Sequence, residues 1–204
     1  MVDPVATTIS LAALAASGVT AWLTLFRRGS VYMTRPTVIF FGPDSGPPSG
    51  VTRPKVFLRF LIYSTGKRGH IIEGMYVTLR RGETRQTFNI WVYGDERLAR
   101  GSGLFVGESG VACNHHFLLP EDGTQFRFLA GDYHVDVFAS IVGWKTLHLA
   151  RIILFLPERA ASELQDPECG IYFDWGPDAE RYHAHIEKRK PPGAPRVTNL
   201  DASS

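Results

Sequence analysis

PVATTISLAALAASGVTAWLTLF, residues 4–26, is an uncharged stretch that is followed at once by Arg27 and Arg28. At about 1.5 Å of rise per residue, these roughly 22 residues would form a helix about 33 Å long, enough to cross a hydrocarbon layer about 30 Å thick. The stretch therefore predicts one transmembrane helix, which occupies residues 4–28 together with its basic flank. The remainder of the chain is then held at a membrane surface by contact between residues 4–28 and lipid.

Two other interpretations of this stretch compete with a membrane span. A cleaved signal peptide would begin with a positively charged region, whereas only Asp3 and the amino terminus precede the apolar run. Residues 13–15 resemble a cleavage site but come too early in the run. A buried helix of a soluble core would usually carry a polar face, and the polar groups here are small hydroxyls that can bond to their own helix. We therefore expect a span.

The charges that flank the stretch predict its orientation. Lys and Arg near a span are retained on the cytoplasmic side, and Arg27, Arg28 and Arg35 follow the span while no basic residue precedes it. We therefore expect the N-terminus outside and the domain in the cytoplasm, at the inner cell membrane. Cys113 and Cys169 are too few for a disulfide framework, so both are expected to be free thiols. A periplasmic or cell-surface domain is the alternative.

Residues 30–156 predict an all-β domain. Short runs rich in Val, Ile, Phe and Tyr alternate there with clusters of Gly, Pro, Asp and Ser. The predicted strands are residues 31–41, with an edge or bulge at Pro36, and residues 55–65, 71–80, 85–93, 111–119, 125–129, 133–142 and 146–156. Within residues 85–93, Phe88, Ile90 and Val92 are expected to share one face. The length suits one domain with a full core, so the predicted architecture is an antiparallel β-sandwich.

One local pattern points to a particular kind of sandwich. Leu129-Ala-Gly-Asp-Tyr133, followed by alternating valines, resembles the tyrosine corner of immunoglobulin-like and fibronectin-like domains. The resemblance implies an immunoglobulin-like sandwich in which the Tyr133 hydroxyl bonds the backbone a few residues upstream. The disulfide that often accompanies this corner is missing, because Cys113 falls in a predicted strand and Cys169 lies beyond the last one, so the exact topology stays open. One span, a basic flank, VYMTRPTVIFFGPD and a sandwich are together similar to uncharacterised bacterial membrane-anchored proteins, which implies no function.

Two further segments follow the predicted sandwich. Residues 157–187 form an aromatic-rich extension that begins with a short helical turn at residues 158–164. In an extended segment Ile171, Phe173 and Trp175 would share a face, so we expect an extra edge strand that packs on the sandwich. An aromatic arm that docks on a partner is the alternative. Residues 188–204 are rich in Pro, Gly and charge and are predicted to be disordered.

Cys113, His115 and His116 form the main cluster of metal-capable side chains. In a strand, Cys113 and His115 point to one face and His116 to the other, so at most two of them can reach one ion. Zinc takes three or four protein ligands, and we therefore expect a half-buried strand, with no metal and no other cofactor. No segment matches a phosphate-binding loop or a Gly-x-Ser-x-Gly elbow, and no residue is nominated as catalytic. A membrane-tethered enzyme or metal protein that uses this cluster is the alternative.

Basic residues in two places indicate contact with lipid headgroups. If the first two strands pair antiparallel, the turn that carries Lys67 and Arg68 returns toward the membrane beside Arg27 and Arg28. Cations in that position are attracted to anionic lipid. A solvated hairpin turn is the simpler explanation.

The sequence predicts a membrane-anchored cytoplasmic β-sandwich that acts as a protein-interaction or assembly module. Sandwiches expose edges and loops that suit binding, and no catalytic set of residues stands out. The partner is an unidentified protein or a second copy of the chain; Ala13, Ser17 and Ala21 form a smooth stripe where another membrane helix could approach closely. A net charge of +2 with mixed signs along the chain argues against nucleic acid as a partner.

Overall fold

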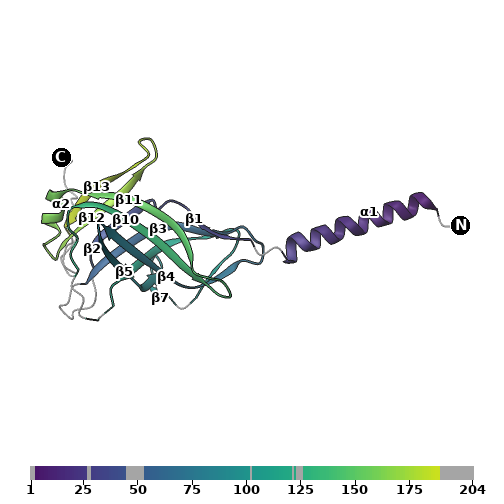
Figure 1. The fold of residues 1–204 in the computed structure, drawn as a ribbon, viewed down its shortest axis with the longest axis horizontal. Coiled ribbons are helices and arrows are strands. Elements are labelled where there is room, and N and C mark those ends of the chain that lie inside the picture. The colour runs from purple at the N-terminus through teal and green to yellow at the C-terminus, as the bar shows by residue number, and fades with distance from the viewer. Residues whose placement is uncertain are drawn as a thin grey trace, which may run out of the picture.

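The computed structural model of the chain describes residues 3–26, 29–44, 53–101, 103–120, 122 and 126–188. Arg27 and Arg28, which flank the predicted span, lie outside the described residues, and so does the predicted disordered tail beyond Lys188. The described residues form a helix and a β-sandwich (Figure 1).

The N-terminal apolar stretch is helical. It forms α1 (Pro4–Ala21), which continues as a short π-helix, η1 (Trp22–Phe26), and extends away from the sandwich (Figure 1). The hydroxyls of Thr8, Ser10 and Thr20 donate to carbonyls four residues earlier, at 2.8 to 2.9 Å. None of the residues of α1 is buried, so α1 is not a core helix; its length and composition suit a membrane anchor or a signal sequence.

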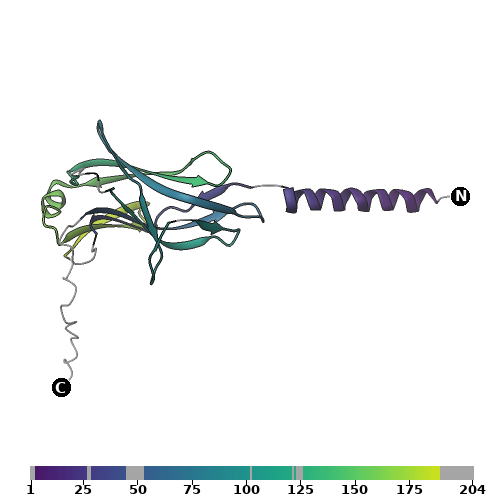
Figure 2. The same cartoon turned by 90° about the horizontal axis from the view of Figure 1, so that it is seen from below.

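Two antiparallel sheets pack face to face and form the sandwich (Figure 2). The larger sheet contains β1 (Val31–Met33), β2 (Val38–Pro43), β3 (Pro54–Ser64), β6 (Ile90–Tyr93), β7 (Ala99–Arg100), β9 (Val111–Leu118), β12 (Cys169–Gly176) and β13 (Arg181–Lys188). The smaller sheet contains β4 (His70–Arg81), β5 (Thr84–Phe88), β8 (Leu104–Val106), β10 (Gly131–Ile141) and β11 (Leu147–Leu156). A short helix, α2 (Glu158–Glu163), lies at the end of the sandwich farthest from α1 (Figure 1). The predicted antiparallel sandwich behind an N-terminal apolar helix is confirmed.

The order of strands brings distant segments together. The larger sheet runs β13-β12-β2-β3-β9-β6-β7, with β1 also paired to β3. The smaller sheet runs β11-β10-β4-β5, with β8 also paired to β4. Because β11 and the β12–β13 hairpin end the two sheets on the same side, that side of the sandwich is open.

Aromatic side chains fill the core between the sheets. Phe41 is fully buried at its centre and contacts Phe128 at 5.0 Å, Phe173 at 5.3 Å and Tyr133 at 5.6 Å between ring centroids. Contacts of this kind add to the free energy of burying large apolar side chains. The core thus joins β2 and β12 of one sheet to β10 of the other.

The predicted strand at residues 85–93 is two strands in different sheets. β5 ends at Phe88 and β6 begins at Ile90, so the chain crosses between the sheets at Asn89. Phe88 and Trp91 both point into the core, with 0% and 4% of their surfaces exposed. The inward face therefore changes from even to odd positions, and the expectation that Phe88, Ile90 and Val92 share a face is wrong.

Other strand predictions also need correction. Of the predicted strand at residues 125–129, residues 126–129 are described and form no strand; Phe126 and Phe128 pack on Phe88 instead. The short strands β7 and β8 were not predicted. The predicted strand at residues 31–41 is divided into β1 and β2 at Pro36, which has no N–H to donate to β3.

The aromatic-rich extension joins the larger sheet. β12 pairs with β2 on one side and β13 on the other, so β12 is not the expected edge strand, and β13 takes that position. Ile171 and Phe173 are each only 1% exposed and belong to the core. They are therefore not available as a free aromatic arm. Cys169 opens β12 and does not lie beyond the last strand.

Candidate functional site

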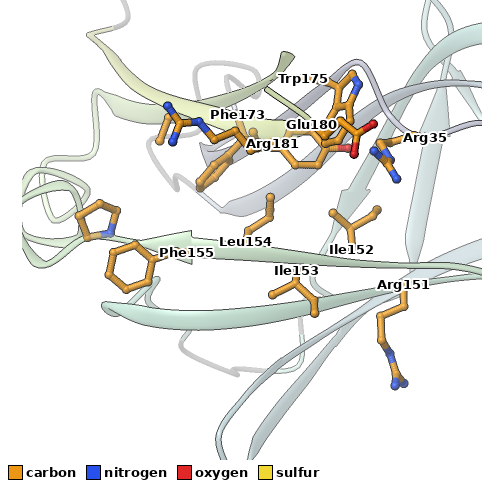
Figure 3. A pocket seen from close by; sticks show the side chains of 13 residues that line it. Arg35, Arg151, Ile152, Ile153, Leu154, Phe155, Phe173, Trp175, Glu180 and Arg181 are labelled. Atoms are coloured by element: carbon orange, nitrogen blue, oxygen red, sulfur yellow. The ribbon is translucent and has the colours of Figure 1, made fainter. Parts of the chain in front are cut away.

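A groove runs along the open side of the sandwich, between β11 and the β12–β13 hairpin (Figure 3). Its volume is about 550 Å³. Ile152 and Leu154 point from β11 toward the hairpin, whereas Ile153 and Arg151 point away (Figure 3). Phe173 lies across from them on β12. The interior of the groove is therefore apolar and contributed by both sheets.

The mouth of the groove is basic and aromatic. The Arg35 guanidinium lies 3.9 Å from the centre of the Trp175 ring, a cation–π contact. Tyr182 of β13 packs edge-on against Trp175 and donates a hydrogen bond of 2.8 Å to the carbonyl of Pro36. Burial raises the pKa of Tyr182, so its hydroxyl stays protonated and keeps this bond. The hairpin is thereby tied to the segment between β1 and β2.

Three arginines and one glutamate line the groove. Arg35 and Arg181 stand at the hairpin side, and Glu180 belongs to the same lining. Arg151 stands at the β11 side, where its guanidinium donates to the Asp136 carboxylate at 2.7 and 3.2 Å. Because Asp136 neutralises Arg151, the positive charge of the groove comes from Arg35 and Arg181 at the hairpin side, opposed by Glu180.

The second half of the β11 edge beside this groove has little of the usual protection of an exposed strand. β11 reads LHLARIILFL, and no described strand pairs with its outer edge. His148, Arg151 and a bulge at Leu149 lie in its first half, whereas residues 152–156 are all apolar. Natural sheets blunt exposed edges with charge, shortness, bulges or proline. The other sheet ends follow this rule: β13 is the polar RYHAHIEK, β5 carries Arg85, and β7 has two residues. Residues 152–156 of β11 are the exception, which suits this part of the edge to pairing with another strand.

The structure brings two of the three metal-capable residues of β9 together. Cys113 Sγ lies 3.4 Å from His115 Nε2, and both side chains point into the core. His116 lies on the opposite face, where its ring packs against Phe57 at 5.0 Å. Trp91 Nε1 donates to His115 Nδ1 at 3.1 Å, so the neutral imidazole must carry its proton on Nε2, facing Cys113.

The surroundings of this pair oppose reactivity. Burial lowers the pKa of His115 to about 3 and raises the pKa of the Cys113 thiol. A neutral imidazole that already donates to sulfur cannot take the thiol proton, and a thiol is a poor nucleophile. His115 also stacks on Phe60 at 4.2 Å. The arrangement is that of a core polar contact, in which each group has a partner.

No three side chains of His, Cys, Asp or Glu within the described ranges are grouped so that they could hold a metal ion. The additional ligands that Cys113 and His115 would need are distant. Cys169 begins β12 and His183 and His185 lie on β13, whereas β3 and β2 separate β9 from these strands.

The turn that carries Lys67 and Arg68 lies next to the start of the sandwich. β2 and β3 pair antiparallel, and the N–H of Ser30 donates to Thr65 Oγ1 at 2.8 Å. The N–H of Thr65 donates in return to the Ser30 carbonyl at 2.9 Å. Arg27 and Arg28, the proposed neighbours of this turn, lie outside the described residues.

Tyr133 forms the predicted local contact. Its side chain is 2% exposed, and its hydroxyl donates to the Leu129 carbonyl at 2.8 Å. This hydrogen bond has the direction and spacing that the resemblance to a tyrosine corner implies.

Sequence reasoning missed the groove. The apolar run of residues 147–156 was recognised as a strand, but a run of this kind is equally typical of a strand buried inside a sheet. Its position at an edge depends on strand order. Comparison with known proteins adds no further guide: no protein-family model matches the chain, and neither the curated proteins nor the solved structures contain a match.

Proposed function

We propose that this protein is a single-span membrane protein whose β-sandwich binds an extended segment of a partner protein along β11. α1 serves as the anchor, and Arg27 and Arg28 keep the sandwich on the cytoplasmic side of a bacterial inner membrane. The observation that carries the proposal is the apolar groove of about 550 Å³ beside residues 152–156 of β11, an apolar stretch of edge with which no described strand pairs.

Strand addition would use both parts of the site. The backbone of an incoming segment pairs with β11, and alternate side chains of that segment enter the groove. Ile152 and Leu154 on one wall and Phe173 on the other are 8%, 2% and 1% exposed. They form a packed apolar floor, whereas Ile153 and Phe155 of the same lining are 62% and 61% exposed and offer an accessible apolar surface beside the β11 edge. Branched or aromatic side chains that cover this surface would supply most of the favourable free energy of such contacts.

The charges at the groove favour an acidic partner segment. Arg35 and Arg181 are exposed beside the hairpin, and Glu180 is the one acidic residue of the lining. Carboxylates on the alternate, solvent-facing positions of the segment would lie near these guanidinium groups, which bind carboxylates with two parallel hydrogen bonds. We therefore assign the site to a segment in which apolar and acidic residues alternate.

An immunoglobulin-like topology fits this role. The bond from Tyr133 to Leu129 supports it, because the same corner stabilises the loop before a late strand in such domains. Domains of this kind bind through strand edges and end loops.

A peptide experiment tests the proposal. Full-length protein in lipid nanodiscs is titrated into a labelled ten-residue peptide in which Val and Leu alternate with Asp and Glu, and binding is followed by fluorescence anisotropy. Amide hydrogen exchange is measured with and without peptide. We expect saturable binding and slower exchange within residues 147–156, with unchanged exchange in β13, because only β11 gains backbone hydrogen bonds.

Matched controls separate strand addition from general attraction. The charge reversals Arg35→Glu and Arg181→Glu together should weaken binding by about ten-fold or more, whereas Arg85→Glu on β5 should leave it within about two-fold. Equal binding of a peptide with its apolar residues in one block, or unchanged exchange of β11, would contradict the proposal. Protection of β11 that grows with protein concentration in the absence of peptide would assign the groove to a second copy of the chain.

A further inference from the structure

The end of the sandwich that follows α1 has a defined structure. The paired hydrogen bonds between Ser30 and Thr65 hold the β3–β4 turn against the first residues of the domain. The approach is backbone to backbone: Gly29 has a φ of 66°, and a Cβ there would lie 2.3 Å from the backbone nitrogen of Gly66. Three residues, 27–29, connect the last residue of η1 to Ser30. Ser30, to which the turn is bonded, is therefore at most about 14 Å from the end of the helix.

Exposed apolar side chains gather at this same end. Ile71, Phe105 and Val142 are 48%, 61% and 56% exposed. Ile71 is the register partner of Phe105, and the N–H of Val142 donates to the Ile71 carbonyl at 3.0 Å. They come from three segments that are separate in sequence, so their grouping is produced by the fold. The same residues line a hollow of about 380 Å³.

Three cationic residues lie on the turns at this end, and one of them, Arg68, lines the same hollow. Lys67 and Arg68 are exposed on the turn, and Lys145 is exposed on the β10–β11 turn next to Val142. The Phe105 ring packs against Gly69 of the β3–β4 turn: a Cβ added at Gly69 would lie only 2.6 Å from the ring. Glu108, exposed between β8 and β9, is an opposing charge at this end.

We propose that this end is a lipid-docking rim, formed by Lys67, Arg68, Ile71, Phe105, Val142 and Lys145, that rests on the anionic leaflet of the bilayer that α1 enters. The inference rests on the anchoring role of α1 given above. Ile71, Phe105 and Val142 reach the boundary between headgroups and acyl chains, and the three cations contact lipid phosphates. The attraction between the cations and the lipid acts only within about 8 Å at physiological salt, so the rim must rest directly on the headgroups; the short connection to α1 keeps it near enough to do so.

Docking has a structural consequence for the partner site. α2 and the ends of β4 and β11 at Arg81 and Leu156 lie at the opposite end of the sandwich (Figure 1). A domain that rests on the rim therefore stands with its strands rising from the membrane. The groove beside β11 then opens sideways, where a segment from a neighbouring membrane-bound or soluble protein could enter it.

Depth-dependent quenching tests the rim. Val142→Cys is labelled with a fluorophore in the full-length protein in vesicles of phosphatidylcholine and phosphatidylglycerol, and quenching by lipids with a nitroxide near the headgroup is measured. Leu129→Cys, 47% exposed, provides the matched label remote from the rim. Cys113 and Cys169 are buried, and wild-type protein carried through the same labelling gives their background.

We expect at least three-fold more quenching at position 142 than at position 129, and at least a two-fold decrease in vesicles of phosphatidylcholine alone. Lys67→Gln with Arg68→Gln should cause a similar decrease, whereas Arg80→Gln with Arg81→Gln, at the other end of β4, should not. Glu108→Gln should increase the quenching.

Equal quenching at the two labels, or no effect of lipid charge and of the Lys67 and Arg68 substitutions, would overturn the rim. Flotation of the vesicles on a density gradient distinguishes the two proposals. Protein that floats but shows equal quenching is anchored without docking, whereas protein that stays at the bottom of the gradient lacks the anchor itself and overturns both.

Discussion

The hydroxyl of Tyr133 bonds both backbone polar groups of Leu129. It donates to the carbonyl at 2.8 Å and accepts from the N–H at 2.9 Å. The two bonds close the loop that leads into β10 and hold it against the core, where the Tyr133 ring contacts Phe41. Burial raises the pKa of Tyr133, so the hydroxyl keeps the proton that it donates.

Tyr133→Phe should lower the free energy of unfolding by about 1 to 3 kcal/mol, because it leaves a backbone donor and acceptor of Leu129 without partners. The measurement is urea unfolding of the full-length protein in detergent micelles, followed by near-ultraviolet circular dichroism. Tyr76→Phe is the control: Tyr76 stacks on Phe138 on the outer face of the sheet, so its loss of a hydroxyl should cost less than about 0.5 kcal/mol. Equal midpoints for the two variants would remove the support that this corner gives to an immunoglobulin-like topology.

The His115 site predicts a pH dependence of stability. The pKa of His115 in the folded protein is about 3, below the value of 6.5 for an unperturbed histidine, because burial disfavours the charged ring. The unfolded chain therefore binds a proton first as pH falls. The stability associated with a neutral His115 is complete above about pH 6.5 and is lost between there and about pH 3.

His115→Gln removes this titration while leaving an amide oxygen that can accept from Trp91. Between pH 7.5 and pH 5 the free energy of unfolding of the wild type should fall by about 2 kcal/mol more than that of the variant. Chemical unfolding of both proteins across this range measures the difference. Parallel stability curves would show that His115 is not neutral and buried as described.

The features that sequence reasoning predicted correctly are local. The Tyr133 contact spans four residues, and the positions of Cys113, His115 and His116 on alternate faces follow from the geometry of a single strand. The apolar stretch of α1 is likewise recognised by its own composition. Each of these needs no knowledge of which strands are neighbours.

The features that were missed depend on tertiary arrangement. Residues 85–93 alternate as one strand would, yet the chain crosses between sheets at Asn89 and reverses its inward face. Phe126 and Phe128 suggest a strand by composition, but they are apolar because they cover the end of the core. The groove exists because β11 ends one sheet beside the hairpin that ends the other, a relationship that strand order alone determines.

Cys113 and Cys169 should react slowly with a thiol reagent in the folded protein. They are 7% and 5% exposed, and burial raises the pKa of each thiol, so little thiolate is available for attack. Titration with a chromogenic disulfide should detect both thiols after denaturation and far slower reaction before it. Rapid reaction of Cys113 in the native protein would revive a catalytic role for its contact with His115.

Cys113→Ser provides the related test of metal binding. A buried free cysteine contributes mainly as a small apolar group, so the substitution should change the free energy of unfolding by less than about 1.5 kcal/mol. Metal analysis of the purified protein should give far less than one zinc per chain. One tightly held zinc per chain that is lost in Cys113→Ser would favour the metal-protein alternative instead.

The orientation of the chain in the membrane is the remaining prediction, and it rests on the arginines that follow the apolar stretch. Positive residues near a span are retained in the cytoplasm, and Arg27, Arg28 and Arg35 all lie on the domain side. A fluorescent reporter that folds only in the cytoplasm, joined after Ser204, should therefore be active, and an alkaline phosphatase reporter, which needs export, should be silent.

Charge exchange across the span tests the cause of this orientation. Replacing Arg27 and Arg28 by Asn and introducing two lysines at Val2 and Asp3 moves the positive charge to the other side of α1, so the phosphatase reporter should gain activity and the fluorescent one should lose it. Removing the two arginines alone should give a mixed population. If phosphatase is active in the unaltered protein, the sandwich lies outside the cytoplasm. Cleavage after α1 in that case, detected as a loss of about 25 residues by mass spectrometry, would identify the helix as a signal sequence and not an anchor.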